Sequence, residues 1–398
     1  MMQRRDLLKF AASAPLALLG THLFAAPQGA PRLLVVFMRG AYDSSSLLIP
    51  VSSDFYYEAR PTIAIPRPGD DAVAALALTD GWGLHPAMQA TLAPLYKARE
   101  LAFIPFAGTD DLSRSHFATQ NAIELGQPAA PRNRYRNGFL NRLAETLGRD
   151  TTRPVSFTTD VPQIWRGALP VPNIDLAGRT GRQILGASRT EAIGQMYRDT
   201  EFSAAVNEGI ELSAIARREL EQEMQQANGK AIPGSQLERE ATRVGRLMAD
   251  RYNLGFLDVG GWDTHVAQGG VQGTLASKLG QLGRALVSYK AAMGSAWRDT
   301  TVVVISEFGR TFRENGSKGT DHGHGTVYWV LGGGVRGGRV AGNQVEVRPD
   351  TLHQDRDYPV LNDYRALFAG LFARLYGLDG RRLQEVFPGV EPQDLQLV

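Results

Sequence analysis

Four polar segments, rich in glycine, hold most of the residues in this chain that could do chemistry. They are residues 39–46, 108–117, 260–265 and 307–325, and they include four of the seven histidines together with several carboxylates. The chain has no cysteine, so a metal site here must use imidazole and carboxylate donors, which suit Zn²⁺ or Mn²⁺. A divalent metal held this way could polarise an ester oxygen and activate a water molecule.

The segment Gly-Thr-Asp-His-Gly-His-Gly at 319–325 is the most specific of the four. Two imidazoles set among glycines can approach one ion with little steric hindrance. The candidate metal ligands, which come from three of the four segments, are Asp43, Asp263, His265, Glu307, Asp321, His322 and His324. Two of these groups also have a structural interpretation: Asp43 could cap a helix or turn, and a contact between Asp263 and His265 could simply fix a loop.

Glu307 and the serines before His116 each leave two interpretations open. Glu307 ends an otherwise apolar run, where a carboxylate needs a partner for its charge. Arg310 is either that partner or a clamp for an anion. Ser113-Arg114-Ser115-His116 precedes a helical pattern, so a serine there is either a helix cap or a nucleophilic hydroxyl beside a metal. The candidate catalytic residues are Ser115, His116 and Arg310.

The elements that position these segments alternate between apolar runs and helical patterns. Strands are expected at 33–38, 101–106, 254–259, 300–306 and 327–331, and helices at 117–125, 275–293 and 361–375. Continuous apolar strands are typical of a sheet covered on both faces. We therefore expect an α/β fold with a doubly wound, mostly parallel sheet. Ligands bind at the carboxyl ends of the strands in such sheets, and all four polar segments directly follow predicted strands.

The chain is expected to form one domain over residues 31–398, with a mostly helical, polar insertion or cap at about 183–252. Hydrophobic residues make up 43% of the 398 and charged residues 21%, which excludes a disordered or collagen-like chain. The formal net charge is only +2, and no basic run is interleaved with aromatic residues. We therefore expect no nucleic-acid partner.

Residues 1–30 have the pattern of an export signal. Arg4 and Arg5 precede a short apolar run, 11–26, that ends in small residues. The paired arginines followed by Leu-Leu-Lys-Phe resemble a twin-arginine (Tat) signal. The alternative, an N-terminal membrane anchor, needs a longer apolar run of about 20 residues. The mature protein is expected to be periplasmic or secreted, without a stable membrane span and with the Tat machinery as its export partner.

Three motifs together resemble a known family. Gly-Gly-Trp-Asp-Thr-His at 260–265, Ser-Glu-Phe-Gly-Arg-Thr at 306–311 and the segment 319–325 look like those of Tat-exported bacterial proteins catalogued as a domain of unknown function. That family is similar to the alkaline phosphatase and sulfatase superfamily. The resemblance implies an alkaline-phosphatase-like α/β sandwich in which one or two divalent metals, Zn²⁺ or Mn²⁺, bridge a nucleophile.

The resemblance also implies roles for individual residues. Asp43 corresponds to the metal ligand after the first strand, and Ser115 to the nucleophile, with Ser113 as the alternative. Asp263 and His265 correspond to metal ligands, with Asp258 as an alternative carboxylate. Glu307 stands where the superfamily has an aspartate, and His322 or His324 corresponds to its late histidine ligand.

The sequence departs from the superfamily pattern at three points. Phe308 stands where a second ligand usually follows, and the spacing of Asp263 and His265 is tighter than usual; both argue against two metals. The absence of cysteine excludes formylglycine chemistry from that source. Two functions remain: a metal-dependent hydrolase of phosphate or sulfate esters, acting on a small anionic ester, or a degenerate relative that binds a cell-envelope ligand or partner protein.

Overall fold

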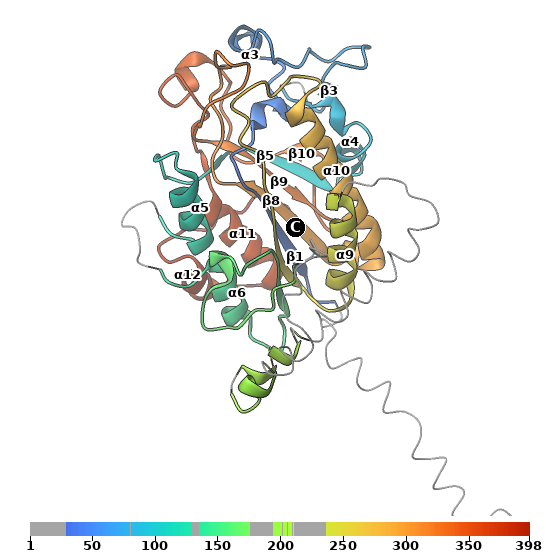
Figure 1. Ribbon diagram of the computed structural model, residues 1–398. Coiled ribbons are helices and arrows are strands. Elements are labelled where there is room, and N and C mark those ends of the chain that lie inside the picture. Colours follow the sequence, from blue (N-terminus) through green and yellow to red (C-terminus); the bar gives the residue numbers. More distant parts are fainter. Residues whose placement is uncertain are drawn as a thin grey trace, which may run out of the picture.

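A mostly parallel sheet of eight strands runs through the centre of the protein, with helices on both of its faces (Figure 1). The structure is a computed structural model that describes residues 29–79, 81–128, 135–175, 194–200, 202–204, 206–208, 210 and 236–398. The first 28 residues, and most of the predicted helical insertion, lie outside these ranges. No helix in the described ranges is both long and apolar enough to cross a membrane.

The strand order is β10-β5-β9-β8-β1-β7-β6, with β11 also paired to β5. The strands are β1 (Arg32–Met38), β5 (Leu101–Gly108), β6 (Pro154–Phe157), β7 (Leu254–Val259), β8 (Thr300–Ser306), β9 (Thr326–Leu331), β10 (Arg339–Val340) and β11 (Asn362–Asp363). Only β9 runs antiparallel to its neighbours, β5 and β8. The five predicted strands are confirmed to within two residues, as is the α/β class. The short strand β6 and the reversed direction of β9 were not predicted.

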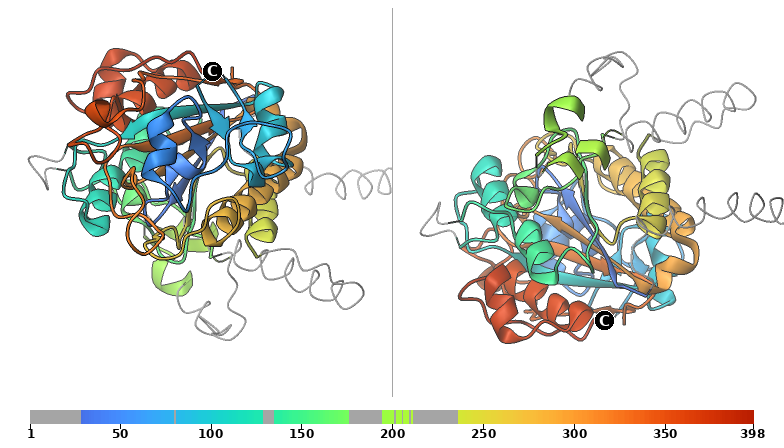
Figure 2. Two further views of the ribbon diagram at one scale, coloured as in Figure 1. Left: turned by 90° about the horizontal axis from the view of Figure 1, so that it is seen from above. Right: turned by 90° about the horizontal axis from the view of Figure 1, so that it is seen from below.

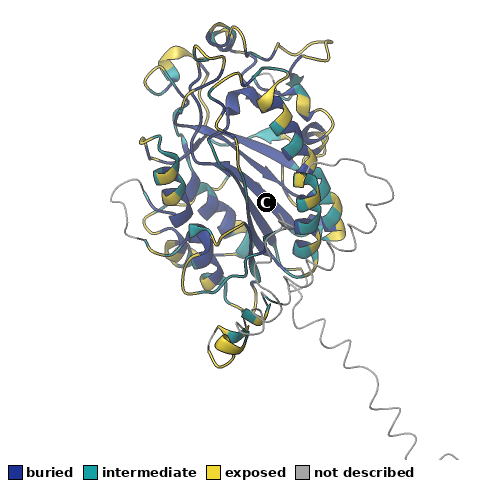
Figure 3. Ribbon diagram, in the orientation of Figure 1, coloured by how far each residue is buried: buried dark blue, intermediate teal, exposed yellow. Residues whose placement is uncertain are grey.

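Successive residues of each central strand contribute to two separate cores. On β1, for example, Leu34, Val36 and Met38 join one core, and Leu33, Val35 and Phe37 join the other. The first core lies under α4 (Leu92–Lys97), α9 (Gln236–Asp250) and α10 (Thr274–Met293). The second lies under α5 (His116–Leu125), α6 (Phe139–Leu147), α11 (Tyr364–Tyr376) and α12 (Gly380–Val386). This double cover explains the continuously apolar strands, which Figure 3 shows as buried.

The predicted helices form close to their expected bounds. The pattern at 275–293 becomes α10, and the pattern at 361–375 becomes α11. Helix α11 starts later than expected because the Asp363 carboxylate caps it, accepting a hydrogen bond from the Arg365 N–H at 2.8 Å. Of the predicted insertion, α9 is the longest described element and packs against α10. The two helices approach closely at Gly245, where a Cβ would lie 2.7 Å from the Cβ of Ala292.

Smaller elements complete the fold. They are α3 (Asp54–Ala59), the antiparallel strands β2 (Leu48–Ile49), β3 (Leu76–Ala77) and β4 (Gly83–Leu84), and short 3₁₀ turns at Ser44–Ser46, Pro86–Met88, Gln163–Trp165, Gly294–Asp299 and Pro349–Thr351. Strands β1, β5, β7 and β8 run in the same direction. Their carboxyl ends therefore share one edge, which Figure 2 (left) views from above, and the four polar segments start there.

Candidate metal centre

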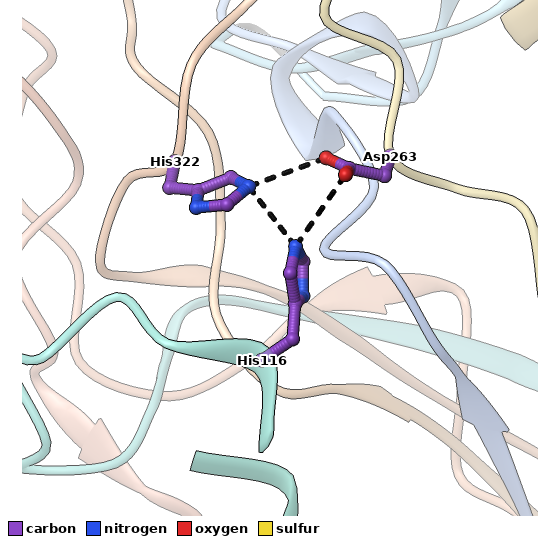
Figure 4. Close-up of side chains that lie close together, drawn as sticks. All are labelled: His116, Asp263 and His322. Atoms are coloured by element: carbon purple, nitrogen blue, oxygen red, sulfur yellow. Dashed lines mark hydrogen bonds and ion pairs between the residues drawn. The ribbon is translucent and has the colours of Figure 1, made fainter. Parts of the chain in front are cut away.

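Three side chains, one from the start of α5 and two from separate loops, converge at this edge of the sheet (Figure 4). The Nε2 atoms of His116 and His322 are 3.0 Å apart. Asp263 closes the triangle, with its Oδ1 3.3 Å from His322 Nε2 and its Oδ2 3.6 Å from His116 Nε2. Two donor atoms bound to one Zn²⁺ lie at most about 4.3 Å apart, because each bond is about 2.0–2.2 Å long. The three donor atoms therefore fit a single ion.

The other ring nitrogens of these histidines fix which atoms face the centre. His322 Nδ1 lies 3.1 Å from the carbonyl oxygen of Arg114, which can only accept, so this nitrogen is the donor. His116 Nδ1 donates in the same way to Glu307 Oε1, at 2.7 Å. Each neutral ring then directs the lone pair of Nε2 toward the other ring. Two such lone pairs 3.0 Å apart repel each other unless a cation, either a proton or a metal ion, lies between them.

His265 contacts two members of this group. Its Nε2 is 2.9 Å from Asp263 Oδ1 and 3.0 Å from His322 Nε2. Its Nδ1 is 3.3 Å from Asp321 Oδ1, which also accepts from the side-chain amide of Asn315 at 3.0 Å. His265 therefore lies against the group, and the three donor atoms that fit one ion are those of His116, Asp263 and His322. Asp321, which was predicted as a ligand, orients the His265 ring instead.

Glu307 is completely buried and is surrounded by donors. Its Oε1 accepts from His116 Nδ1, from the Gly40 N–H at 2.8 Å and from Gln120 Nε2 at 2.8 Å, and its Oε2 accepts from the Ser306 hydroxyl at 3.0 Å. Burial alone raises the pKa of this carboxyl, but the hydrogen bonds from His116 and Gln120 bring the pKa below its ordinary value. The same hydrogen bond raises the pKa of His116. Glu307 therefore holds His116 in place, and its charge partner is not Arg310.

Arg310 is buried and its five N–H groups all have acceptors. Nε donates to the Ala41 carbonyl, Nη1 to the Thr320 carbonyl and His265 Nε2, and Nη2 to the Gly40 carbonyl and to Asp263 Oδ1. Burial raises the pKa of Asp263, but Arg310 outweighs that effect and the pKa is lowered overall. Arg310 thus anchors a member of the metal group, and no donor is left over to clamp an anion.

The glycines around this site allow backbones to approach one another. A Cβ on Gly309 would lie 1.9 Å from the Gly325 carbonyl oxygen, one on Gly319 2.3 Å from the His265 oxygen, and one on Gly323 2.5 Å from the Arg310 oxygen. Each of these distances is far too short for a real contact. The glycines of 319–325 therefore let this loop lie directly on the backbone around Arg310 and His265, a role different from the access to an ion that the sequence suggested.

Asp43 and His324 lie outside the group. Asp43 forms a buried two-point ion pair with Arg60, at 2.6 and 2.9 Å, and also accepts from Gln268 at 2.7 Å. His324 packs against His353, with ring centres 5.2 Å apart. Burial, followed by the positive charges of His353 and Arg114, lowers the pKa of His324 to about 4. Of the two late histidines, only His322 joins the group.

The predicted alternatives Ser115, Ser113 and Asp258 also have partners. Ser115 caps α5, its hydroxyl accepting from the Ala118 N–H at 3.5 Å. The Ser113 hydroxyl lies 3.5 Å from that of Thr119, and Asp258 pairs with Arg39 Nε at 2.7 Å.

Sequence reasoning missed two residues that support the site. Gln120 bridges Glu307 and Arg39, donating to the first at 2.8 Å and accepting from the second at 2.9 Å. It follows His116 by four residues in α5, so both side chains lie on one helix face. This spacing of four residues was the feature of the sequence that could have identified Gln120. The second residue is Arg114, whose carbonyl orients His322 from a left-handed backbone conformation with φ of 52°.

The chain matches the family described as Protein of unknown function (DUF1501) over residues 30–387, and it belongs to this family. The resemblance to a family of unknown function is thereby confirmed. No curated protein matches the chain. One of the matching solved structures is the crystal structure of Ps i-CgsB in complex with k-i-k-neocarrahexaose, with 10% sequence identity and a TM-score of 0.38. The match covers 92% of this chain and 75% of that chain.

We predict that Gly40→Ala disrupts the metal group. Gly40 has a φ of 118°, and a Cβ there would lie 2.7 Å from the backbone nitrogen of Asp263. The strain should cost at least about 1–3 kcal/mol and displace Asp263. Metal content after purification and thermal unfolding measure both effects. Gly260→Ala is the matched control, since its Cβ would meet no atom within 4 Å. Equal metal content in the two variants would contradict the prediction.

Asp43→Asn should destabilise the fold without acting through the metal group. The change leaves the Arg60 charge buried and unpaired, which costs about 3–5 kcal/mol. Burial raises the pKa of Asp43, but Arg60 lowers it below the ordinary 3.8 overall. The difference in unfolding free energy between the wild type and the variant is therefore fully present above pH 3.8, and it is lost as the pH falls through the lower pKa that Asp43 has in the folded state. Urea unfolding of both proteins across pH 2–7 tests this. If the difference in unfolding free energy were the same at every pH, the result would contradict this prediction. Loss of metal from a variant that still folds would show that Asp43 is a metal ligand.

Proposed function

We propose that this protein is an exported, metal-dependent hydrolase of phosphate or sulfate esters. The observation that carries the proposal is the convergence of His116, Asp263 and His322 from three separate segments onto one point. An imidazole lone pair that faces another at 3.0 Å is a costly arrangement without a cation. The position of the group, at the carboxyl ends of parallel strands, is where α/β sheets hold their ligands.

The donor set supports Zn²⁺ or Mn²⁺ held by His116, Asp263 and His322, with His265 as the fourth donor. When bound, such an ion would polarise an ester oxygen and lower the pKa of a neighbouring hydroxyl or water. Phe308 stacks on the His116 ring, with ring centres 4.9 Å apart. A phenylalanine at that position supplies no donor atom, so we favour one metal over two.

Residues of the chain itself prepare this site for an anionic ester. Glu307 and Arg310 orient His116 and Asp263, respectively. Ser115 directly precedes His116 at the start of α5, where helix N–H groups and the helix dipole favour an anion. Since the donors of Arg310 are all used, Arg114 is the better candidate to steady the substrate. Its Nη2 reaches Asp357 at 3.2 Å and Gln354 at 3.4 Å, and its buried Nε has no hydrogen-bond partner.

Export by the Tat pathway is part of the proposal and rests on the signal at residues 1–30. We expect replacement of Arg4 and Arg5 by lysine to leave the precursor in the cytoplasm, measured by fractionation and immunoblotting. Replacement of Lys9 by arginine is the control, because it changes a cation outside the arginine pair. Unchanged export of the paired-lysine variant would contradict the Tat assignment.

The metal is tested by changing its donors. We expect the purified protein to carry one equivalent of Zn²⁺ or Mn²⁺ and to hydrolyse p-nitrophenyl phosphate or sulfate. Asp263→Asn combined with His265→Ala, or His322→Ala alone, should remove both the metal and the activity. His353→Ala is the control, because this histidine lies outside the group. A metal-free, active wild type would refute the proposal. Stoichiometric metal without turnover on a broad panel of esters would favour the alternative, a binding protein.

The nucleophile is tested at Ser115. If its hydroxyl attacks the ester, Ser115→Asn should lower kcat by about 10⁴-fold, while asparagine preserves the helix cap. The metal content and the melting temperature should then stay close to those of the wild type. Ser113→Ala serves as the comparison. Full activity of Ser115→Asn would assign the attack to water, and inactivity of Ser113→Ala alone would assign it to Ser113.

A further inference from the structure

A buried glutamine joins two of the loops that meet at the metal group. Gln268 is completely buried. Its side-chain oxygen, Oε1, accepts from the Thr264 hydroxyl at 3.2 Å and from the Thr320 hydroxyl at 3.0 Å. Its side-chain nitrogen, Nε2, donates to Asp43 Oδ2 at 2.7 Å. We call these three hydrogen bonds the Gln268 clip.

The partners of the amide fix its orientation. The Asp43 carboxylate forms a two-point ion pair with Arg60, so it is ionised and can only accept hydrogen bonds. The Gln268 nitrogen must therefore face Asp43, and the Gln268 oxygen faces the two threonines, whose hydroxyls donate. Both lone pairs of that oxygen are then used. Because a buried amide without partners is costly, these bonds hold the side chain in one orientation.

The clip joins the loop of Asp263 to the loop of His322. Thr264 directly follows Asp263, and Thr320 lies two residues before His322. The main chains of these loops also meet here, because the Thr320 N–H donates to the Thr264 carbonyl at 3.4 Å. The donor atoms that the two loops supply, Asp263 Oδ1 and His322 Nε2, lie 3.3 Å apart (Figure 4). The clip therefore spans the same two loops as this pair of donors.

The clip is anchored at its base and along its backbone. Asp43 is held by Arg60, whose Nε also donates to the Phe312 carbonyl at 2.7 Å. The Gln268 N–H donates to the Lys318 carbonyl, in the loop before β9, at 3.0 Å. Asp43→Asn keeps an acceptor oxygen for the amide, so the clip does not depend on the charge of Asp43.

We infer that Gln268 is a positioning residue of the metal group, because the clip sets the spacing between the loop of Asp263 and the loop of His322. The inference rests on the proposed function and adds to it a residue outside the ligand set. Gln268 acts through the two threonine hydroxyls rather than as a ligand. Replacing residues that orient the ligands of a metal commonly lowers its affinity by about 10–100-fold.

The test is the affinity of the purified protein for Zn²⁺, measured by competition with a chelating dye. Thr264→Val and Thr320→Val each replace one hydroxyl by a methyl group, and Gln268→Met removes the whole clip. We expect about tenfold weaker Zn²⁺ binding in each valine variant and about 100-fold weaker binding in Gln268→Met. Thr264→Ser keeps the hydroxyl and should bind Zn²⁺ like the wild type. The valine variants carry the test if Gln268→Met does not fold.

Thr301→Val is the matched control. Thr301 is also buried, at 2% exposed, but it lies near the start of β8, at the other end of the strand from Glu307. This variant should keep the wild-type affinity. The absorption spectrum of the Co²⁺-loaded protein is a second readout. A changed spectrum in a folded clip variant reports a changed ligand geometry, which lower stability alone would not produce.

The outcomes separate the clip from the catalytic proposal. If the wild type binds Zn²⁺ and the clip variants bind it equally tightly, with an unchanged Co²⁺ spectrum, Gln268 has no positioning role and ester hydrolysis is unaffected. An equal loss of affinity in Thr301→Val, or in Thr264→Ser, would also overturn the role of the clip. Weaker binding confined to the clip variants, in a protein that cleaves no ester, would support the clip and overturn the hydrolase. A wild type that binds neither Zn²⁺ nor Mn²⁺ would overturn both.

Discussion

The buried guanidinium of Arg310 is the interaction on which this site depends. It binds the carbonyls of Gly40 and Ala41 after β1, the Asp263 carboxylate after β7 and the carbonyl of Thr320 before β9. A charged group removed from water needs partners for all its donors, so these three loops are held together at one point. Arg310 thereby holds the Asp263 carboxylate beside the histidines.

A second buried charge completes the arrangement from the opposite side. Glu307 receives hydrogen bonds from the loop after β1 through Gly40 and from α5 through His116 and Gln120. The Glu307 carboxylate thereby sets both the position and the tautomer of His116. Ligand rings in metal sites are commonly oriented by such outer carboxylates. Two buried charges of opposite sign, Glu307 and Arg310, thus lie three residues apart after β8 and fix two different donors, His116 and Asp263.

Several elements were predictable because they follow from local patterns. The buried strands at 254–259 and 300–306 and the helix at 275–293 were read from runs and spacings of apolar residues, and the structure has them at nearly the same bounds. The gathering of the polar segments at one edge followed from the parallel direction of their strands. The direction of β9 was not predictable, because an apolar strand reads the same whether it pairs in parallel or antiparallel.

The sequence by itself determined the α/β class, the polar loops and the set of residue types that could bind a metal, since periodicity and composition act over a few residues. Only the tertiary structure decided which members meet. Asp43 and His322 both looked like ligands, yet Asp43 is neutralised by Arg60, seventeen positions along the chain, and His322 faces His116, 206 positions away. A buried charge must have a partner, but which partner it has depends on which distant segments the fold brings together. Local sequence does not show this.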